Sequence, residues 1–229
     1  MAIAALTSWR ERYPWLGYLS PFVVLIALIS LPKGQALIYW EWPIQVAVVG
    51  AVAYATWPDE LPIRPTRWLT SIAIGVLVFG LWIAPEVVYP PYRHLPIFSN
   101  ALFGHVGSSL QAEALKSKSV LFWRTIRAST VVPIAEELFW RAWLMRWIAN
   151  NDFEKVPLGA YRPVAFWLTA LFFGAEHGPY WEVGLITGVI YNFWMVRSKS
   201  VADCILMHAV TNLLLSIYVI AYGQWQYWQ

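Results

Sequence analysis

The sequence predicts an all-α fold, a polytopic bundle of transmembrane helices, and three observations support this prediction. Hydrophobic residues make up 59% of the 229 residues and charged residues only 13%, against roughly a quarter charged in an ordinary soluble domain. Apolar runs long enough to cross a bilayer recur along the chain. The chain also has 16 Trp and 12 Tyr, residues that favour the membrane interface. Together these features indicate that lipid is the main solvent of the fold.

Membrane-crossing helices need about 20 mostly apolar residues each. Seven segments are candidates, namely Trp15 to Leu31, Ala36 to Trp57, Trp68 to Val88, Val120 to Ala149, Val164 to Gly178, Trp181 to Val196 and Val201 to Tyr222. The fifth and sixth are short, so they are tilted, paired or joined by a loop buried within the protein. The stretch from Tyr89 to Ser119 is rich in Pro and Gly and predicts a loop with an interfacial helix. An eighth span results if this stretch also crosses.

One membrane domain is expected for residues 1–229. Residues 1–119 would form N-terminal spans and the interfacial loop, and residues 120–229 a catalytic core. Arg10 and Arg12 precede the first apolar run as in a signal peptide, but this run reaches Pro32 without a small-residue cleavage pattern, so a retained anchor is expected. The formal charge of +3 comes from basic residues scattered between apolar runs, so nucleic-acid binding is not expected.

The fourth segment carries ionisable residues, which are costly in a membrane and mark either a functional site or a paired structural cluster. Glu137 and Arg141 are four apart with the acid first, the favoured order for an ion pair within a helix. Glu136 lies about 100° away around the helix and lacks that partner, which suits a general base. Pro133 frees the carbonyl of Ser129 and predicts a kink. A purely structural ion pair with one extra acid remains the alternative.

Two later segments each place a pair of functional residues on one helix face by i to i+4 spacing. The first pair is Phe173 and His177, and the second is His208 and Asn212. Alone, such a His is more often a packing residue, and His and Asn often join helices by hydrogen bonds. Together with Glu136, however, they supply a base, two imidazoles and an amide on three helices. This combination predicts one polar site within the bundle.

The two imidazoles must reach a common depth. At 1.5 Å per residue, His177 lies about 20 Å from the start of its segment and His208 about 10 Å from the start of its own. Both segments begin on the same side in a seven-span arrangement. The helices must therefore be tilted, staggered or broken near Gly174 and Gly178.

The three motifs are Glu-Glu-x-x-x-Arg from Glu136, Phe-x-x-x-His from Phe173 and His-x-x-x-Asn from His208. As a set they resemble the type II CAAX prenyl protease and Abi family of intramembrane glutamate endopeptidases, over about the C-terminal half of the chain. The resemblance implies a multi-pass protein of a bacterial inner membrane that uses no metal or other cofactor. Its implied partners are the lipid bilayer and a membrane-associated protein or peptide substrate. Some relatives, such as an exosortase-associated branch, handle other peptides, so prenyl specificity is left open.

The resemblance also implies a role for each motif residue. Glu136 and His177 would activate a water molecule, while His208 and Asn212 would stabilise the tetrahedral oxyanion. Peptide hydrolysis requires such a base and such preorganised donors. The supporting residues implied by the same motifs are Glu137, Arg141 and Phe173.

Alternatives remain at the level of residues and of function. Zinc is a rival because two His and one Glu form a familiar ligand set, although no His-Glu-x-x-His is present. Cys204 shares the face of His208, but a buried inert cysteine is favoured over a nucleophile. Glu176 is expected to point away from its neighbour His177. No role is assigned to Glu41 and Glu86, which lie near span ends where they can reach the interface, or to His94 and His105 in the loop region. A non-catalytic scaffold or bacteriocin-immunity-like protein, and a proton-coupled transporter, are the rival functions.

Overall fold

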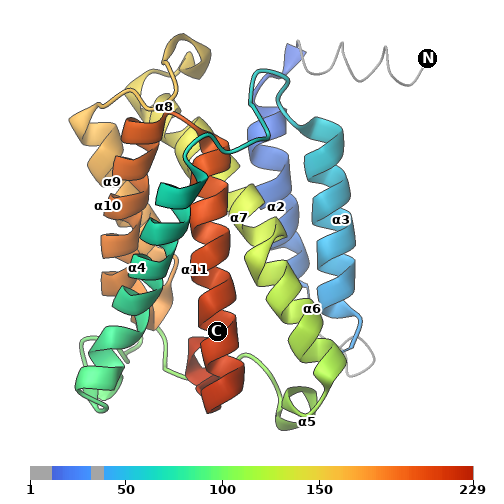
Figure 1. The fold of residues 1–229 in the computed structure, drawn as a ribbon, viewed down its shortest axis with the longest axis vertical. Coiled ribbons are helices and arrows are strands. Elements are labelled where there is room, and N and C mark those ends of the chain that lie inside the picture. The colour runs from blue at the N-terminus through green and yellow to red at the C-terminus, as the bar shows by residue number, and fades with distance from the viewer. Residues whose placement is uncertain (1–11, 32–38, 229) are drawn as a thin grey trace.

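The structure is a computed structural model that describes residues 12–31 and 39–228, and it is a bundle of helices (Figure 1). The part of the chain that it describes contains no β-strand. The predicted all-α fold is therefore confirmed. Arg10, Pro32 and the first residues of the second predicted span, 36–38, lie outside the described residues.

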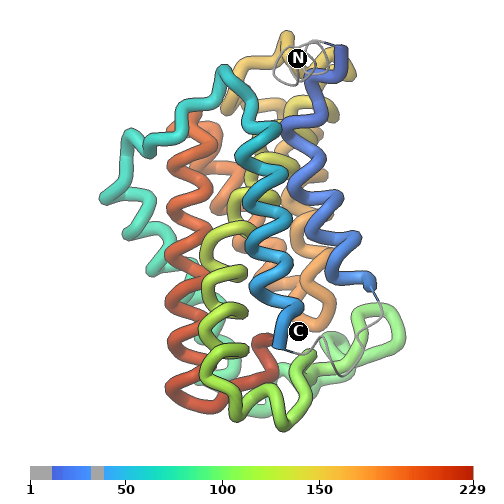
Figure 2. The backbone as a smooth tube through the Cα atoms, turned by 90° about the vertical axis from the view of Figure 1, so that its right-hand side faces the viewer, coloured from blue at the N-terminus to red at the C-terminus, as the bar shows by residue number. Residues whose placement is uncertain are grey.

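The longer helices run alternately up and down the bundle (Figures 1 and 2). They are α2 (Leu16–Ser30), α3 (Glu41–Thr56), α4 (Trp68–Val88), α6 (Lys118–Ser129), α9 (Pro163–Ala175), α10 (Trp181–Ser198) and α11 (Val201–Tyr222). The shorter elements are η2 (Tyr92–His94), α5 (Ala112–Leu115), α7 (Val131–Glu137), η3 (Leu138–Leu144), α8 (Met145–Ala149), η4 (Phe153–Lys155), η5 (Gly178–Tyr180) and η6 (Trp225–Tyr227). The bounds of α4 and α11 coincide with predicted spans.

Two helices, α4 and α11, have the length and composition of a membrane span. They contain 21 and 22 residues, each with a mean hydropathy of 2.0. Large apolar side chains on their outer faces are open to the surroundings, such as Leu77 with 59% and Ile217 with 52% of its surface exposed. Exposed apolar faces of this kind suit lipid better than water. The described residues are thus consistent with a membrane protein, while α2 and α9 are apolar but shorter, and the count of seven spans is not confirmed.

The fourth predicted segment, Val120 to Ala149, consists of several helical elements in succession rather than one straight helix. α6 ends at Ser129, and α7 begins after Thr130, whose φ of −127° and ψ of −78° lie outside the α-helical region. The cause is close by in the sequence, because Pro133 has no N–H to bond the carbonyl of Ser129. The predicted kink is therefore present as a break at Thr130.

A second irregularity follows directly, because α7 continues into η3, a π-helix of seven residues, before α8 begins. π-helical turns are rare and occur frequently at functional sites. Arg141 lies within η3, one turn after Glu137 at the end of α7. The periodicity of the sequence did not predict this element.

The helix that carries the Phe-x-x-x-His motif also ends early. α9 stops at Ala175, so His177 lies on the turn that leads into η5 and α10. Gly178 has a φ of +53°, a conformation that glycine adopts without strain. Gly174 brings α9 against α10, because a Cβ at this position would lie 2.9 Å from the backbone of Leu185. The chain is therefore broken near Gly178, which was one of the predicted arrangements for the two imidazoles.

α4 and α11 pack closely at the depth of His208. A Cβ at Gly75 would lie 2.6 Å from the carbonyl oxygen of Met207, so only glycine permits this approach. Nearer the start of both helices, the buried carboxylate of Asp203 accepts hydrogen bonds from the backbone of Arg67 (2.7 Å) and the hydroxyl of Ser71 (3.0 Å). These contacts hold α11 in register with α4 and so fix the position of His208.

Candidate active site

The carboxylate of Glu137 is the centre of the polar cluster and has no exposed surface. Its Oε1 accepts hydrogen bonds from Nη1 of Arg141 at 3.1 Å and from Nδ1 of His208 at 2.8 Å. The ion pair predicted from the spacing of Glu137 and Arg141 is thus present. The spacing did not predict the second contact, by which Glu137 orients the imidazole of His208 on α11.

Arg141 is fully buried and is held from several sides. Its Nε donates to Oδ1 of Asn192 at 3.2 Å, and its guanidinium lies 4.2 Å from the ring centre of Phe173 and 5.2 Å from that of Tyr191. Asn192 in turn donates to the carbonyl of Phe166 at 2.8 Å. Asn192 and Tyr191 were missed from the sequence. The signal that marks Asn192 is an amide inside the otherwise apolar middle of α10.

Glu136 faces His208 across a gap. Its Oε2 lies 3.9 Å from Nε2 of His208, which is longer than a direct hydrogen bond. This oxygen is buried and has no hydrogen-bond partner among the described residues. Because Glu137 holds the other ring nitrogen, the imidazole presents Nε2 to Glu136. In the proposed reaction an oxygen atom beside both groups would join them by hydrogen bonds.

His177 is packed between two aromatic rings. Its ring centre lies 4.8 Å from that of Phe173 and 5.3 Å from that of Trp82. Its Nδ1 lies 2.6 Å from the carbonyl oxygen of Phe173, so we assign the proton to Nδ1, which leaves Nε2 as the acceptor. The ring of Phe173 also lies 6.2 Å from that of His208. Phe173 therefore contacts both imidazoles of the motifs.

Asn212 lies one helical turn after His208 on α11. Its Nδ2 donates to the carbonyl of Ala128 at 2.9 Å, in the last turn of α6 before the break at Thr130. The side chain therefore joins α11 to α6 close to the site. Its role as an oxyanion donor stays a prediction.

The residues that the sequence left without a role fall into two groups. Cys204 is buried, with Sγ 3.8 Å from the sulfur of Met195, which agrees with an inert cysteine. Glu176 follows the end of α9 at Ala175 and is exposed, and the expectation that it points away from His177 stays a prediction. No group of three or more His, Cys, Asp or Glu residues placed for a metal ion occurs in residues 12–31 and 39–228.

A cavity of about 450 Å³ lies at the end of the bundle that carries η4. It is lined by Pro14, Trp15, Leu19, Trp143, Trp147, Asn151, Asp152, Phe153 and Glu154. None of the motif residues is among them. The cluster around Glu137 is the better candidate site because it brings the ionisable side chains of the motifs together, whereas the cavity contains none of them.

Gly184 on α10 makes room for His177, and this leads to a prediction. A Cβ at Gly184 would lie 3.1 Å from Cβ, Cγ and Nδ1 of His177, so an added methyl group displaces the imidazole by a few tenths of an ångström. We expect Gly184→Ala to lower the rate of the reaction at this site by about 10-fold, because small misplacements of catalytic groups are costly. Gly80→Ala is the matched control, since a Cβ there meets nothing within 4 Å. Equal rates for the two variants would contradict a role for the position of His177.

The C-terminal part of the chain is similar to a known protein family. Residues 118–214 match the family described as type II CAAX prenyl endopeptidase Rce1-like. The match extends from the start of α6 into α11 and includes all three motifs. The comparisons with curated proteins and with solved structures gave no match.

Proposed function

We propose that this protein is a membrane endopeptidase that cleaves by glutamate-activated water, because residues 118–214 match the protease family described as type II CAAX prenyl endopeptidase Rce1-like. The substrate is a membrane-associated protein or peptide. The protein itself is an integral, multi-pass protein, in which α2, α3, α4, the run from α6 to α8, α9, α10 and α11 cross the bilayer. A bacterial inner membrane is its proposed location. The alternating directions of these helices support the multi-pass arrangement (Figure 1).

The proposed reaction takes place between the side chains of Glu136 and His208. Glu136, assisted by His177, removes a proton from water, and the resulting hydroxide attacks the carbonyl carbon of the scissile peptide bond. His208 and Asn212 donate to the oxyanion of the tetrahedral intermediate. Collapse of the intermediate breaks the C–N bond, and the proton held by the base passes to the leaving amine.

One observation carries this proposal: the buried Oε2 of Glu136 has no hydrogen-bond partner in the described part of the chain and lies 3.9 Å from Nε2 of His208. A carboxylate of purely structural function would be expected to pair with a cation, as Glu137 does with Arg141. Glu136 instead faces His208 without a direct hydrogen bond. The arrangement of Glu137 behind His208 supports the same reaction, because a carboxylate on Nδ1 fixes which nitrogen faces the substrate.

The test of the proposed function is cleavage of membrane-anchored peptides by the purified, reconstituted protein with and without a strong chelator. We expect cleavage that the chelator does not reduce. Chelator-sensitive cleavage that zinc restores would instead assign His177 and His208 as metal ligands. If no peptide in a broad membrane-anchored library is cleaved, the endopeptidase proposal is wrong, and binding of the peptides without cleavage would favour a scaffold.

A further inference from the structure

Arg93, in the loop after α4, belongs to none of the three motifs but is among the most buried side chains, with 1% of its surface exposed. Its Nε donates to Glu86 at 2.9 Å, and its Nη1 lies 2.7 Å from a carboxylate oxygen of Glu182. Burial by itself would lower the pKa of Arg93, but the two carboxylates raise it above its ordinary value. Arg93 therefore remains charged across the pH range in which proteins are stable.

The same guanidinium also contacts the turn that carries His177. Nη1 of Arg93 donates to the carbonyl of Pro179 at 2.7 Å, two residues after His177. The guanidinium also lies 4.1 Å from the ring centre of Tyr180, within the range of a cation–π interaction. Arg93 thus fixes both the backbone and a side chain of this turn.

From Tyr180 the contacts lead directly to the imidazole. The ring of Tyr180 stacks on that of Trp82 with centres 5.8 Å apart, and the ring of Trp82 lies 5.3 Å from that of His177. Trp82 is held in turn, because its Nε1 donates to the hydroxyl of Thr187 at 2.9 Å. A change at Arg93 therefore reaches His177 by two routes, one through the backbone and one through two stacked rings.

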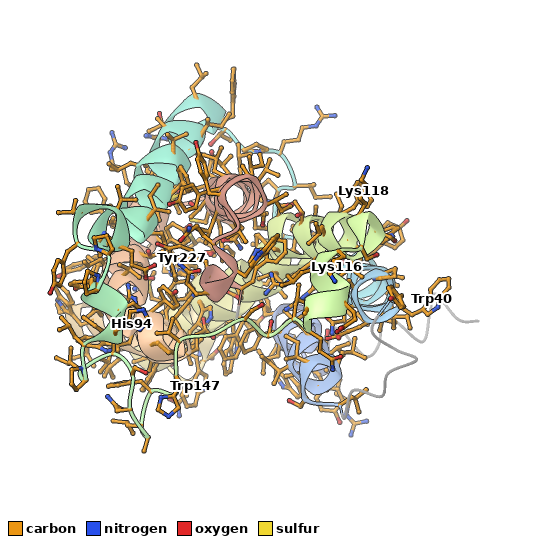
Figure 3. The ribbon with its side chains drawn as sticks, turned by 90° about the horizontal axis from the view of Figure 1, so that it is seen from below. Trp40, His94, Lys116, Lys118, Trp147 and Tyr227 are labelled. Carbon is orange, nitrogen blue, oxygen red and sulfur yellow. The ribbon has the colours of Figure 1, made fainter. Side chains whose placement is uncertain are left out.

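The residues around Arg93 pack together and cover this end of the bundle. The C-terminal segment joins the cluster, since Gln226 donates to Glu86 at 3.4 Å and the hydroxyl of Tyr180 donates to the carbonyl of Gln226 at 3.2 Å. Seen from below, Tyr227 lies near the middle of this end (Figure 3), and it has only 9% of its surface exposed. The turn after His177 is therefore packed on several sides, with Arg93 as the cation that joins α4, the loop and α10.

We propose that Arg93 is a positioning residue for His177, which it holds in its reactive orientation through Pro179 and through the rings of Tyr180 and Trp82. This inference rests on the proposed function, in which His177 assists water activation. It assigns a role in the reaction to the loop after α4, which lies outside residues 118–214. Arg93 contacts neither the water nor the substrate and acts only through the turn.

Arg146 offers a matched control at the opposite end of the bundle. It is also buried, with 7% of its surface exposed, and its Nε donates to the carbonyl of Val156 at 2.7 Å. It likewise lies over an aromatic ring, 5.0 Å from the centre of Phe153. Arg146 thus shares two kinds of contact with Arg93, a hydrogen bond to a backbone carbonyl and a contact with an aromatic ring, on a turn that does not carry a motif residue.

The experiment compares Arg93→Lys with Arg146→Lys in the full-length, reconstituted protein. Lysine keeps the charge but loses the planar fork of donors, so both variants should lose similar thermal stability. Only Arg93→Lys should lower kcat, by about 10- to 100-fold, with KM unchanged, because substrate binding does not involve the turn. Equal kcat values for the two variants would overturn the proposal.

A second readout does not depend on activity and separates this inference from the proposed function. Diethylpyrocarbonate modifies accessible imidazoles, and mass spectrometry of peptides reports each site separately, with the exposed His105 as internal reference. We expect faster modification of His177, relative to His105, in Arg93→Lys and not in Arg146→Lys. If the wild-type protein cleaves no peptide, the proposed function fails, while this comparison still decides whether Arg93 holds His177. If Arg93→Lys does not fold, Glu182→Gln, which weakens the same contact, should show the same change, and an unchanged rate there would refute the proposal.

Discussion

Replacing Glu136 by glutamine is expected to lower the rate of peptide cleavage by about 10²- to 10⁴-fold, the usual contribution of a general base. The amide has nearly the shape of the carboxylate but cannot accept a proton from water. Because Oε2 of Glu136 has no hydrogen-bond partner among the described residues, the substitution breaks no hydrogen bond of this oxygen. The thermal unfolding midpoint should therefore stay at the wild-type value. Steady-state cleavage of a membrane-anchored peptide, together with thermal unfolding, measures both effects.

Glu113→Gln is the control for this experiment, because it makes the same chemical change at an exposed residue of α5. It should cleave at the wild-type rate. A Glu136→Gln protein that cleaves as fast as Glu113→Gln would remove Glu136 from the reaction. If Glu136→Gln instead unfolds at a much lower temperature, the carboxylate has a structural role that the contacts do not predict.

Replacing Glu137 by glutamine is expected to act mainly on stability. Both side chains of the Glu137–Arg141 pair have no exposed surface, so the substitution leaves the charge of Arg141 buried without its counter-ion. Breaking a buried pair in this way costs about 3–5 kcal/mol of the free energy of unfolding. His208 also loses the carboxylate that orients it, so the remaining folded protein should cleave slowly. Denaturant unfolding in micelles, followed by tryptophan fluorescence, measures the loss.

Two further variants distinguish a buried charge from a lost contact. Asp152→Asn removes the partner of Lys155 in an exposed ion pair and should leave stability unchanged, because exposed pairs contribute little. The double variant Glu137→Gln with Arg141→Met removes both buried charges and should recover part of the lost stability without recovering activity. A Glu137→Gln protein as stable as the wild type would show that Arg141 is already neutralised by other groups.

Much of the helical framework could be predicted from the sequence. Hydropathy located the bounds of α4 and α11 residue by residue, because a long apolar run flanked by polar residues has few alternative arrangements in lipid. The spacing of Glu137 and Arg141 predicted an ion pair that is present, since i to i+4 geometry is local to one helix. For the same reason the three motifs could be identified, and residues 118–214 match the expected family.

Contacts between helices could not be predicted in this way. No spacing within α7 indicates that Glu137 also holds His208, or that Oε2 of Glu136 lies 3.9 Å from the same ring. Asn192 and Arg93 have no motif, and their partners lie far away in the sequence. Each of these contacts depends on how helices approach one another, which close-packed glycines such as Gly75 and Gly184 permit.

The sequence by itself determined that this protein is helical, apolar and equipped with three motifs, because hydropathy and i to i+4 spacing act within single helices. The tertiary structure decided which of the arrangements left open near Gly178 is adopted and which nitrogen of each imidazole faces the site. The physical reason is that backbone breaks at Thr130 and Gly178 change the direction of everything that follows. The i to i+4 spacing therefore no longer predicts which side chains share a face beyond such a break. There, the position of each side chain depends on how its segment packs against other helices.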